Sequence, residues 1–124
     1  MPRFMTLIRI DEENATRFEP DPGFEDRMGA LFAEITKAGV MLDTAGLLPT
    51  KEGTRLLWEG GRVSWTDGPF TETKEVVGGY ALLQCKDKAE ALEWTRRFLE
   101  THPASWTVGA ELRQIDEAAA PPEA

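Results

Sequence analysis

Apolar residues recur along this chain with periods that predict a mixed α+β domain. Residues 4–10 carry apolar side chains on both sides of an alternating run, so this segment is typical of a central strand. Residues 24–38 repeat apolar side chains at helical spacing, and Gly39 follows where a helix end favours a left-handed residue. Asp87 and Glu90 form a capping-box pattern at the start of a second amphipathic helix. Residues 11–23 are expected to form a loop, and further strands are predicted over residues 79–86 and 108–115.

The segment 55–66 predicts a β-hairpin almost residue by residue. Gly60 and Gly61 separate two alternating runs, and this pair suits the positive φ angles of a two-residue turn. In that register Glu59 lies opposite Arg62 as an ion pair. The opposite face then collects the apolar side chains of Leu56, Trp58, Val63 and Trp65.

The predicted element order, β-α-β-β-β-α-β, contains no repeat. Two amphipathic helices with four or five strands in this order indicate an α+β fold, a ferredoxin-like antiparallel sheet with both helices on one face. At 124 residues the chain has the size of one domain. We expect that domain over residues 1–116, followed by a flexible tail over residues 117–124.

The most distinctive motif is the segment 65–75, which reads WTDGPFTETKE. Asp67, Gly68 and Pro69 predict a tight turn, because Asp bonds to nearby backbone, Gly accepts a positive φ and Pro fixes the direction of exit. Four ionisable side chains lie in this one short segment. The motif is therefore the first place to look for chemistry.

Together with other stretches, this segment resembles the YCII-related, or DGPF-domain, family. The further stretches are AGVML at 38–42, GLLP at 46–49, GGY at 78–80, EALEW at 90–94 and ELR at 111–113. The resemblance implies a homodimer in which two sheets pack face to face as a dimeric α+β barrel, with a ligand pocket between the sheet and a helix or loop layer. Some relatives are thought to use a His–Asp pair with the His early in the chain. Here no histidine precedes His102, so that pair is not carried over.

Charge and composition narrow the classes of function. With 22 acidic and 14 basic residues, the formal charge of −8 repels nucleic acids, so direct binding of DNA or RNA is not expected. No apolar run reaches the roughly 20 residues of a membrane span, and no signal peptide is evident. The single cysteine cannot form an internal disulfide, so a cytoplasmic location is expected.

This sequence lacks the residues that several kinds of chemistry require. One histidine and one cysteine cannot build a Cys/His metal cluster, so no metal and no cofactor are predicted. A Mg²⁺ site made of the carboxylates of Asp67, Glu72 and Glu75 stays open as an alternative, but it lacks diagnostic spacing. Cys85 lies in an apolar segment without a neighbouring histidine, and His102 is expected to interact with the end of the second helix.

The motif has two interpretations. In the functional one, Asp67 or Glu75 is a general base and Lys74 stabilises an enolate-like charge. The predicted substrate-binding residues are Trp65, Phe70, Glu72, Tyr80 and Arg55. In the structural one, Asp67 caps the turn, Phe70 fills the core, and the charged residues form ion pairs across a dimer or with Arg55 and Arg62.

Two functions of different class follow. The first is a small-molecule-binding protein or enzyme that uses proton transfer at residues 67–75 on an acidic organic substrate, as relatives of muconolactone-isomerase type suggest. The second is a non-catalytic accessory or regulatory dimer linked to an alternative sigma factor, which the family resemblance implies.

Overall fold

The computed structural model describes residues 1–13 and 21–118. Its elements in chain order are β1 (Arg3–Ile10), α1 (Pro22–Lys37), β2 (Met41–Gly46), the 3-10 helix η2 (Thr50–Glu52), β3 (Thr54–Glu59), β4 (Arg62–Asp67), β5 (Val76–Gln84), α2 (Lys88–Glu100) and β6 (Gly109–Gln114). Most of the predicted loop and of the predicted tail lies outside the described residues.

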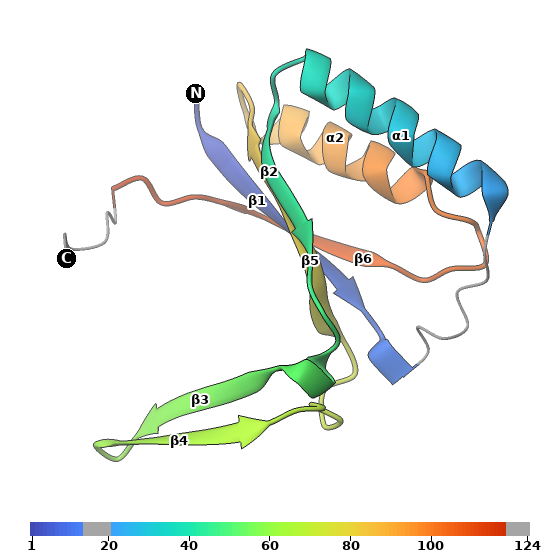
Figure 1. Ribbon diagram of the computed structural model, residues 1–124. Helices are drawn as coiled ribbons and strands as arrows, with labels where there is room; N and C mark the ends of the chain where they lie inside the picture. The colour runs from blue at the N-terminus through green and yellow to red at the C-terminus, as the bar shows by residue number, and fades with distance from the viewer. Residues whose placement is uncertain (14–20, 119–124) are drawn as a thin grey trace.

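Four of the strands form one antiparallel sheet, and both helices cover the same face of it (Figure 1). The strand order is β2-β5-β1-β6, which places the first strand in the centre as predicted. This order is consistent with a ferredoxin-like arrangement, and the predicted α+β class with an antiparallel sheet is confirmed. The dimeric barrel stays a prediction.

The core lies between the helices and the sheet. Phe4 of β1 is 1% exposed and lies on the face of the sheet that the helices cover. Residues two apart on a strand share a face, so alternate residues of β1 point to the same side. Around it pack Ile35, Val40, Leu83, Cys85 and Ala91, with Met41, Ala81, Trp94 and Leu112 at the margin. Burial of these side chains fixes the two helices on the sheet.

The end of α1 and both limits of α2 lie where the sequence predicts them, whereas α1 begins at Pro22, inside the predicted loop, where Asp21 caps it. The carboxylate of Asp87 accepts a hydrogen bond from the Glu90 amide at 2.9 Å, and the carboxylate of Glu90 accepts one from the Lys86 amide at 3.1 Å. Residue 39, after α1, is a glycine with φ of 71°, the left-handed conformation that ends many helices. Local capping chemistry thus sets the limits of these elements.

The hairpin is correct in register but stands apart from the main sheet. Glu59 lies opposite Arg62 in the strand pairing, although the predicted ion pair between them is absent from the described residues, and Gly60 and Gly61 have φ of 61° and 79°. We call the hairpin formed by β3 and β4, residues 54–67, the arm. Figure 1 shows that the arm leaves the lower end of the sheet and reaches away from the helices.

One strand was missing from the sequence prediction. β2 is an edge strand that pairs only with β5, and most of its residues are exposed, so it lacks a clear apolar period. β5 also begins earlier than predicted, at Val76, which places Gly78 and Gly79 inside the strand rather than at its entry.

Candidate functional site

A cavity lies between the helices and the sheet. Its volume is about 230 Å³. The side chains that contribute to it come from α1, α2 and three strands, and they include Phe32, Ile35, Met41, Leu83, Trp94 and Phe98. None of the residues that line this pocket is charged. The pocket is thus an apolar chamber formed by elements distant in sequence.

Two threonine hydroxyls supply buried polar groups in this pocket. Thr6 on β1 and Thr95 on α2 are 3% and 9% exposed, and their Oγ1 atoms are 3.0 Å apart. Two hydroxyls carry two hydrogens, and only one is used between them. Since no further acceptor for either hydroxyl occurs among the described residues, the second hydrogen is available to a ligand.

Glycines shape the pocket beside β2. A Cβ on Gly79 would lie 2.9 Å from the carbonyl oxygen of Ala45, and a Cβ on Gly78 would lie 2.9 Å from the side chain of Ile10. A side chain at residue 79 would push β5 away from the backbone of β2, whereas one at residue 78 would require the side chain of Ile10 to move. The glycine pair therefore permits close packing next to the exposed residues Ala45 and Gly46, which also line the pocket.

Tyr80 is the one predicted site residue that lines the pocket. Its hydroxyl donates to Oδ2 of Asp43 at 2.8 Å, across the β2–β5 pair. This hydrogen bond and the charge of Asp43 raise the pKa of Tyr80 above its ordinary value, so the phenol stays protonated at neutral pH.

The motif lies elsewhere, at the root of the arm. Oδ1 of Asp67 accepts a hydrogen bond from the hydroxyl of Thr54 at 2.9 Å. The amide of Gly68 donates to the carbonyl of Gly53 at 2.8 Å, which extends the hairpin ladder by one bond. The first residues of the motif therefore close the base of the hairpin.

Gly68 is required for a reason other than the predicted one. Its φ is not positive, and the Gly68–Pro69 peptide bond is cis. A Cβ on Gly68 would lie 1.7 Å from the carbonyl oxygen of Thr50, so no side chain fits at this position. The steric limit comes from close approach of two backbone segments.

Thr50 connects three parts of the chain at this point. Its amide donates to the Glu12 carboxylate at 2.8 Å, and its hydroxyl also donates to Glu12. The same hydroxyl oxygen accepts from the amide of Phe70 at 3.3 Å. We call the set of Glu12, Thr50, Gly68 and Phe70 the Thr50 joint, because it fastens the arm to the segment that follows β1.

Arg55, a residue of the arm, packs against the Thr50 joint. Its guanidinium lies 3.9 Å from the centre of the Phe70 ring, forms an ion pair with Glu72, and donates to the hydroxyl of Thr73 at 3.1 Å. This ion pair is the one that the structural interpretation of the motif predicts. Phe70 is only half-buried and lies outside the main core, contrary to that interpretation.

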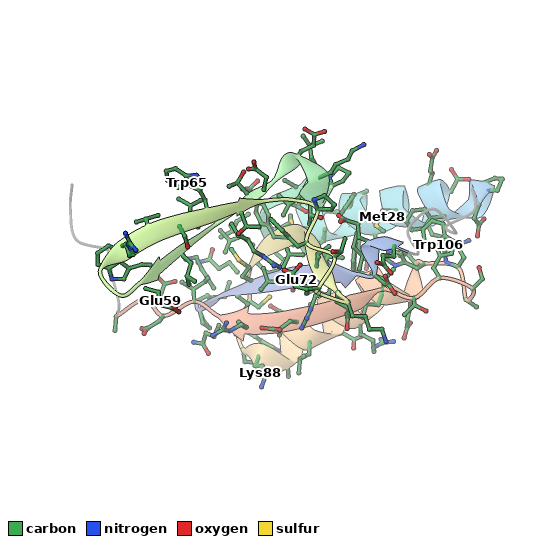
Figure 2. The ribbon with its side chains drawn as sticks, turned by 90° about the horizontal axis from the view of Figure 1, so that it is seen from below. Met28, Glu59, Trp65, Glu72, Lys88 and Trp106 are labelled. Carbon is green, nitrogen blue, oxygen red and sulfur yellow. The ribbon has the colours of Figure 1, made fainter. Side chains whose placement is uncertain are left out.

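The remaining predicted residues are dispersed. Lys74 and Glu75 are exposed, and no ion pair between them and another described residue is present. Trp65 projects from the arm, far from Glu72 in the centre of Figure 2. The structure thus brings Arg55, Phe70 and Glu72 together, whereas the catalytic roles of Asp67, Lys74 and Glu75 stay predictions.

A second, smaller cavity of about 110 Å³ lies against the joint. It is lined by Glu12, Glu13, Pro69, Phe70, Thr71 and Thr73. Glu12 is already engaged by Thr50. This cavity is therefore a crevice beside a structural contact.

His102 and Cys85 both have structural surroundings. Nδ1 of His102 lies 3.1 Å and 3.0 Å from the carbonyl oxygens of Phe98 and Leu99, so it donates a hydrogen at the end of α2 as expected. Burial, and then the charge of Glu90, raises the pKa of the Cys85 thiol to about 11, which leaves almost no thiolate at neutral pH.

Residues 1–13 and 21–118 contain no group of three or more His, Cys, Asp and Glu side chains that could hold a metal ion. Within the same ranges no helix has the length and apolar character needed to cross a membrane.

The fold and the pocket define a small α+β protein with an antiparallel sheet, two helices and an apolar chamber between them. The family model of the YCII-related domain matches residues 3–109, so the chain belongs to the YCII-related family. It is also similar to an uncharacterised protein of Rhizobium meliloti (strain 1021), with 32% identity over 78 residues. That match covers 63% of each chain.

The close approach of Thr50 to Gly68 predicts a large effect of Gly68→Ala. We expect the free energy of unfolding to fall by about 3 kcal/mol, because a rigid backbone carbonyl must move to admit the Cβ. Gly29→Ala is the matched control, since nothing lies within 4 Å of a Cβ at this helical position, and it should stabilise by about 0.5–1 kcal/mol. Urea unfolding followed by circular dichroism measures both free energies of unfolding. Equal values for the two variants would contradict the close contact between Gly68 and Thr50.

The hydroxyl pair predicts non-additive stabilities. Thr6→Val or Thr95→Val alone leaves one buried hydroxyl without its partner and should cost about 1–2 kcal/mol. The double variant removes both hydroxyls and should be more stable than the sum of the single changes predicts, by about 1 kcal/mol. A double-mutant cycle in urea measures this coupling energy. A coupling near zero would show that the hydroxyls do not depend on each other.

Proposed function

We propose that this protein binds a small, uncharged and largely apolar molecule in the pocket between the helices and the sheet. The observation that carries the proposal is the pocket of about 230 Å³, lined by apolar side chains with no charged residue among them. An apolar cavity of about 150 Å³ is sufficient to hold benzene. The volume therefore suits a molecule with one ring and a short substituent.

The absence of charge in the lining argues against the acidic substrate that we expected. A carboxylate placed among these side chains would lose its hydration without gaining a cation as partner, which costs several kcal/mol. The formal charge of −8 on the whole chain also repels anions. A neutral ligand avoids both costs.

The Thr6–Thr95 pair gives the ligand one polar point of attachment. Its unused hydroxyl hydrogen can donate to a carbonyl or ether oxygen, while most of the remaining lining offers apolar contact. Sites of this kind derive affinity from apolar burial and orientation from a few polar groups. The proposed ligand class is thus a single-ring or similarly small molecule with one hydrogen-bond acceptor.

Proton transfer at residues 67–75 has less support from the structure than binding in the pocket. Asp67, Lys74 and Glu75 are exposed and do not line the pocket, so a substrate in the pocket is not within their reach. A reaction at these residues would need a separate binding place at the root of the arm. Binding in the pocket requires no second binding place.

The regulatory alternative has one observation in its favour, the exposed apolar arm, which suits contact with another protein chain. A link to an alternative sigma factor rests on the family resemblance alone.

Three probes test the ligand class: acetophenone, its hydrocarbon counterpart ethylbenzene, and benzoate. We expect acetophenone and ethylbenzene to bind and benzoate not to bind, as followed by chemical shifts in an NMR titration. Replacing both threonines, Thr6→Val with Thr95→Val, should weaken acetophenone about fivefold, because both hydroxyl donors are lost, and should leave ethylbenzene unchanged. Thr95→Ser keeps a hydroxyl and is the matched control. Tighter binding of benzoate than of acetophenone would contradict the proposed class.

Substitutions in the motif separate the pocket from residues 67–75. Asp67→Asn keeps an oxygen that accepts from Thr54, so stability should change by less than about 0.5 kcal/mol. Lys74→Ala removes an exposed side chain and should cost less than about 1 kcal/mol. Neither change should alter the affinity for acetophenone in the same titration. If either variant kept its stability and lost the ligand, the site would belong to the motif.

A further inference from the structure

The floor of the pocket is a row of residues that crosses the sheet. Thr6 of β1 pairs with Ala81 of β5, and Ala81 pairs in turn with Thr44 of β2. Directly paired residues share a face of the sheet, and all three line the pocket. Since neighbouring strands lie about 4.8 Å apart, the row spans roughly 10 Å. It leads from the hydroxyl pair in the centre of the sheet to the edge strand.

The rows on the two sides of this one differ in bulk. On one side, large side chains belong to the core or pack against it: Phe4, Leu83 and Met41. On the other side, Ile8 of β1 is followed on β5 and β2 by two glycines, Gly79 and Gly46. The floor of the pocket is therefore lowest over β5 and β2, toward the edge of the sheet.

The pocket opens to solvent at this edge. Thr44 and Gly46 line the pocket and are nevertheless exposed. Phe32 of α1 also lines the pocket and is 37% exposed. Figure 1 shows α1 and β2 diverging from the short connection that joins them, so the mouth of the pocket lies between Phe32 and the edge strand. We call the passage from Thr6 over Ala81 to this mouth the trough.

Apolar surface continues beyond the mouth. Leu47 and Leu48 directly follow Gly46 and are 52% and 78% exposed. A compact ligand that lay wholly inside the pocket would leave this surface in water. A ligand with an apolar chain would cover part of it, and burial of apolar surface favours binding.

We infer that the ligand carries an apolar chain opposite its hydrogen-bond acceptor, and that this chain lies in the trough and leaves through the mouth beside β2. The inference rests on the proposed function, because it takes the Thr6–Thr95 pair as the place that binds the acceptor. A chain on the far side of the ring then points along the row toward Thr44. A chain next to the acceptor would instead meet Ile8 or Leu83, whose rows flank that of Thr6.

Gly46 is the residue that keeps the mouth open. It lies two residues after Thr44 and shares its face of β2. Its φ is not positive, and the nearest atom to a Cβ at this position would be the carbonyl oxygen of Gly78 at 4.0 Å. Neither the backbone conformation nor the packing of the chain therefore requires glycine here. A β-branched side chain suits a strand, but at residue 46 it would stand in the mouth of the trough.

The test uses para-butylacetophenone and its ortho isomer, which carry the same chain at different places on the ring. Dissociation constants for both and for acetophenone are measured by NMR titration of the full-length protein. We expect the para isomer to bind at least about tenfold more tightly than acetophenone, and the ortho isomer to bind more weakly than acetophenone. Gly46→Val should reduce the advantage of the para isomer over acetophenone to less than about threefold. Gly29→Val is the matched control, because residue 29 is exposed, has no atom within 4 Å of a Cβ and does not line the pocket, and it should keep the full advantage.

Circular dichroism of the same samples establishes whether each variant keeps its fold. Phe32→Trp is a second variant that narrows the mouth from α1, and it should also reduce the advantage of the para isomer. A para isomer that binds no more tightly than acetophenone overturns the inference and leaves the proposed function standing, as does an advantage that Gly46→Val and Phe32→Trp both leave unchanged. Failure of acetophenone itself to bind overturns the proposed function and this inference together.

Discussion

The position of the arm depends on one steric constraint, the contact between the backbone of Gly68 and the carbonyl oxygen of Thr50. Any side chain at residue 68 would occupy the place of that oxygen, since a Cβ would lie 1.7 Å from it. Thr50 is held in turn by Glu12, and its hydroxyl receives the amide of Phe70. The segment after β1, the helix η2 and the motif thus meet at one residue, and the arm grows from this point.

This arrangement separates two roles that the sequence places in a single motif. The motif holds the arm, whereas the apolar pocket lies between the helices and the sheet. Membership of the YCII-related family describes the fold of residues 3–109 and leaves the ligand to be established by experiment. The charge-free lining of the pocket favours a neutral molecule, and the exposed face of the arm favours a second protein chain.

Sequence patterns predicted the parts of the fold that local chemistry determines. The Gly60–Gly61 turn fixes the register of the arm, and Asp87 with Glu90 fixes the start of α2. β2 was missed because an exposed edge strand leaves no apolar alternation. The role of Gly68 was misread because its neighbour Thr50 is distant in sequence. A pocket between the sheet and a helix or loop layer was expected from the family resemblance, but of its lining residues only Tyr80 was named. Thr6 and Thr95, polar residues within apolar periods, were the signal that could have located it.

The central claim is that the ligand site and the motif are separate places, and mapping of bound acetophenone by NMR tests it most directly. Backbone amides should be assigned in the free protein, and their shifts followed as acetophenone is added. We predict that the largest changes occur at Gly79, Ala81 and Thr95, which line the pocket, and that Gly68 and Thr71 stay within error. Changes concentrated at residues 67–75, with the pocket residues unaffected, would contradict the account.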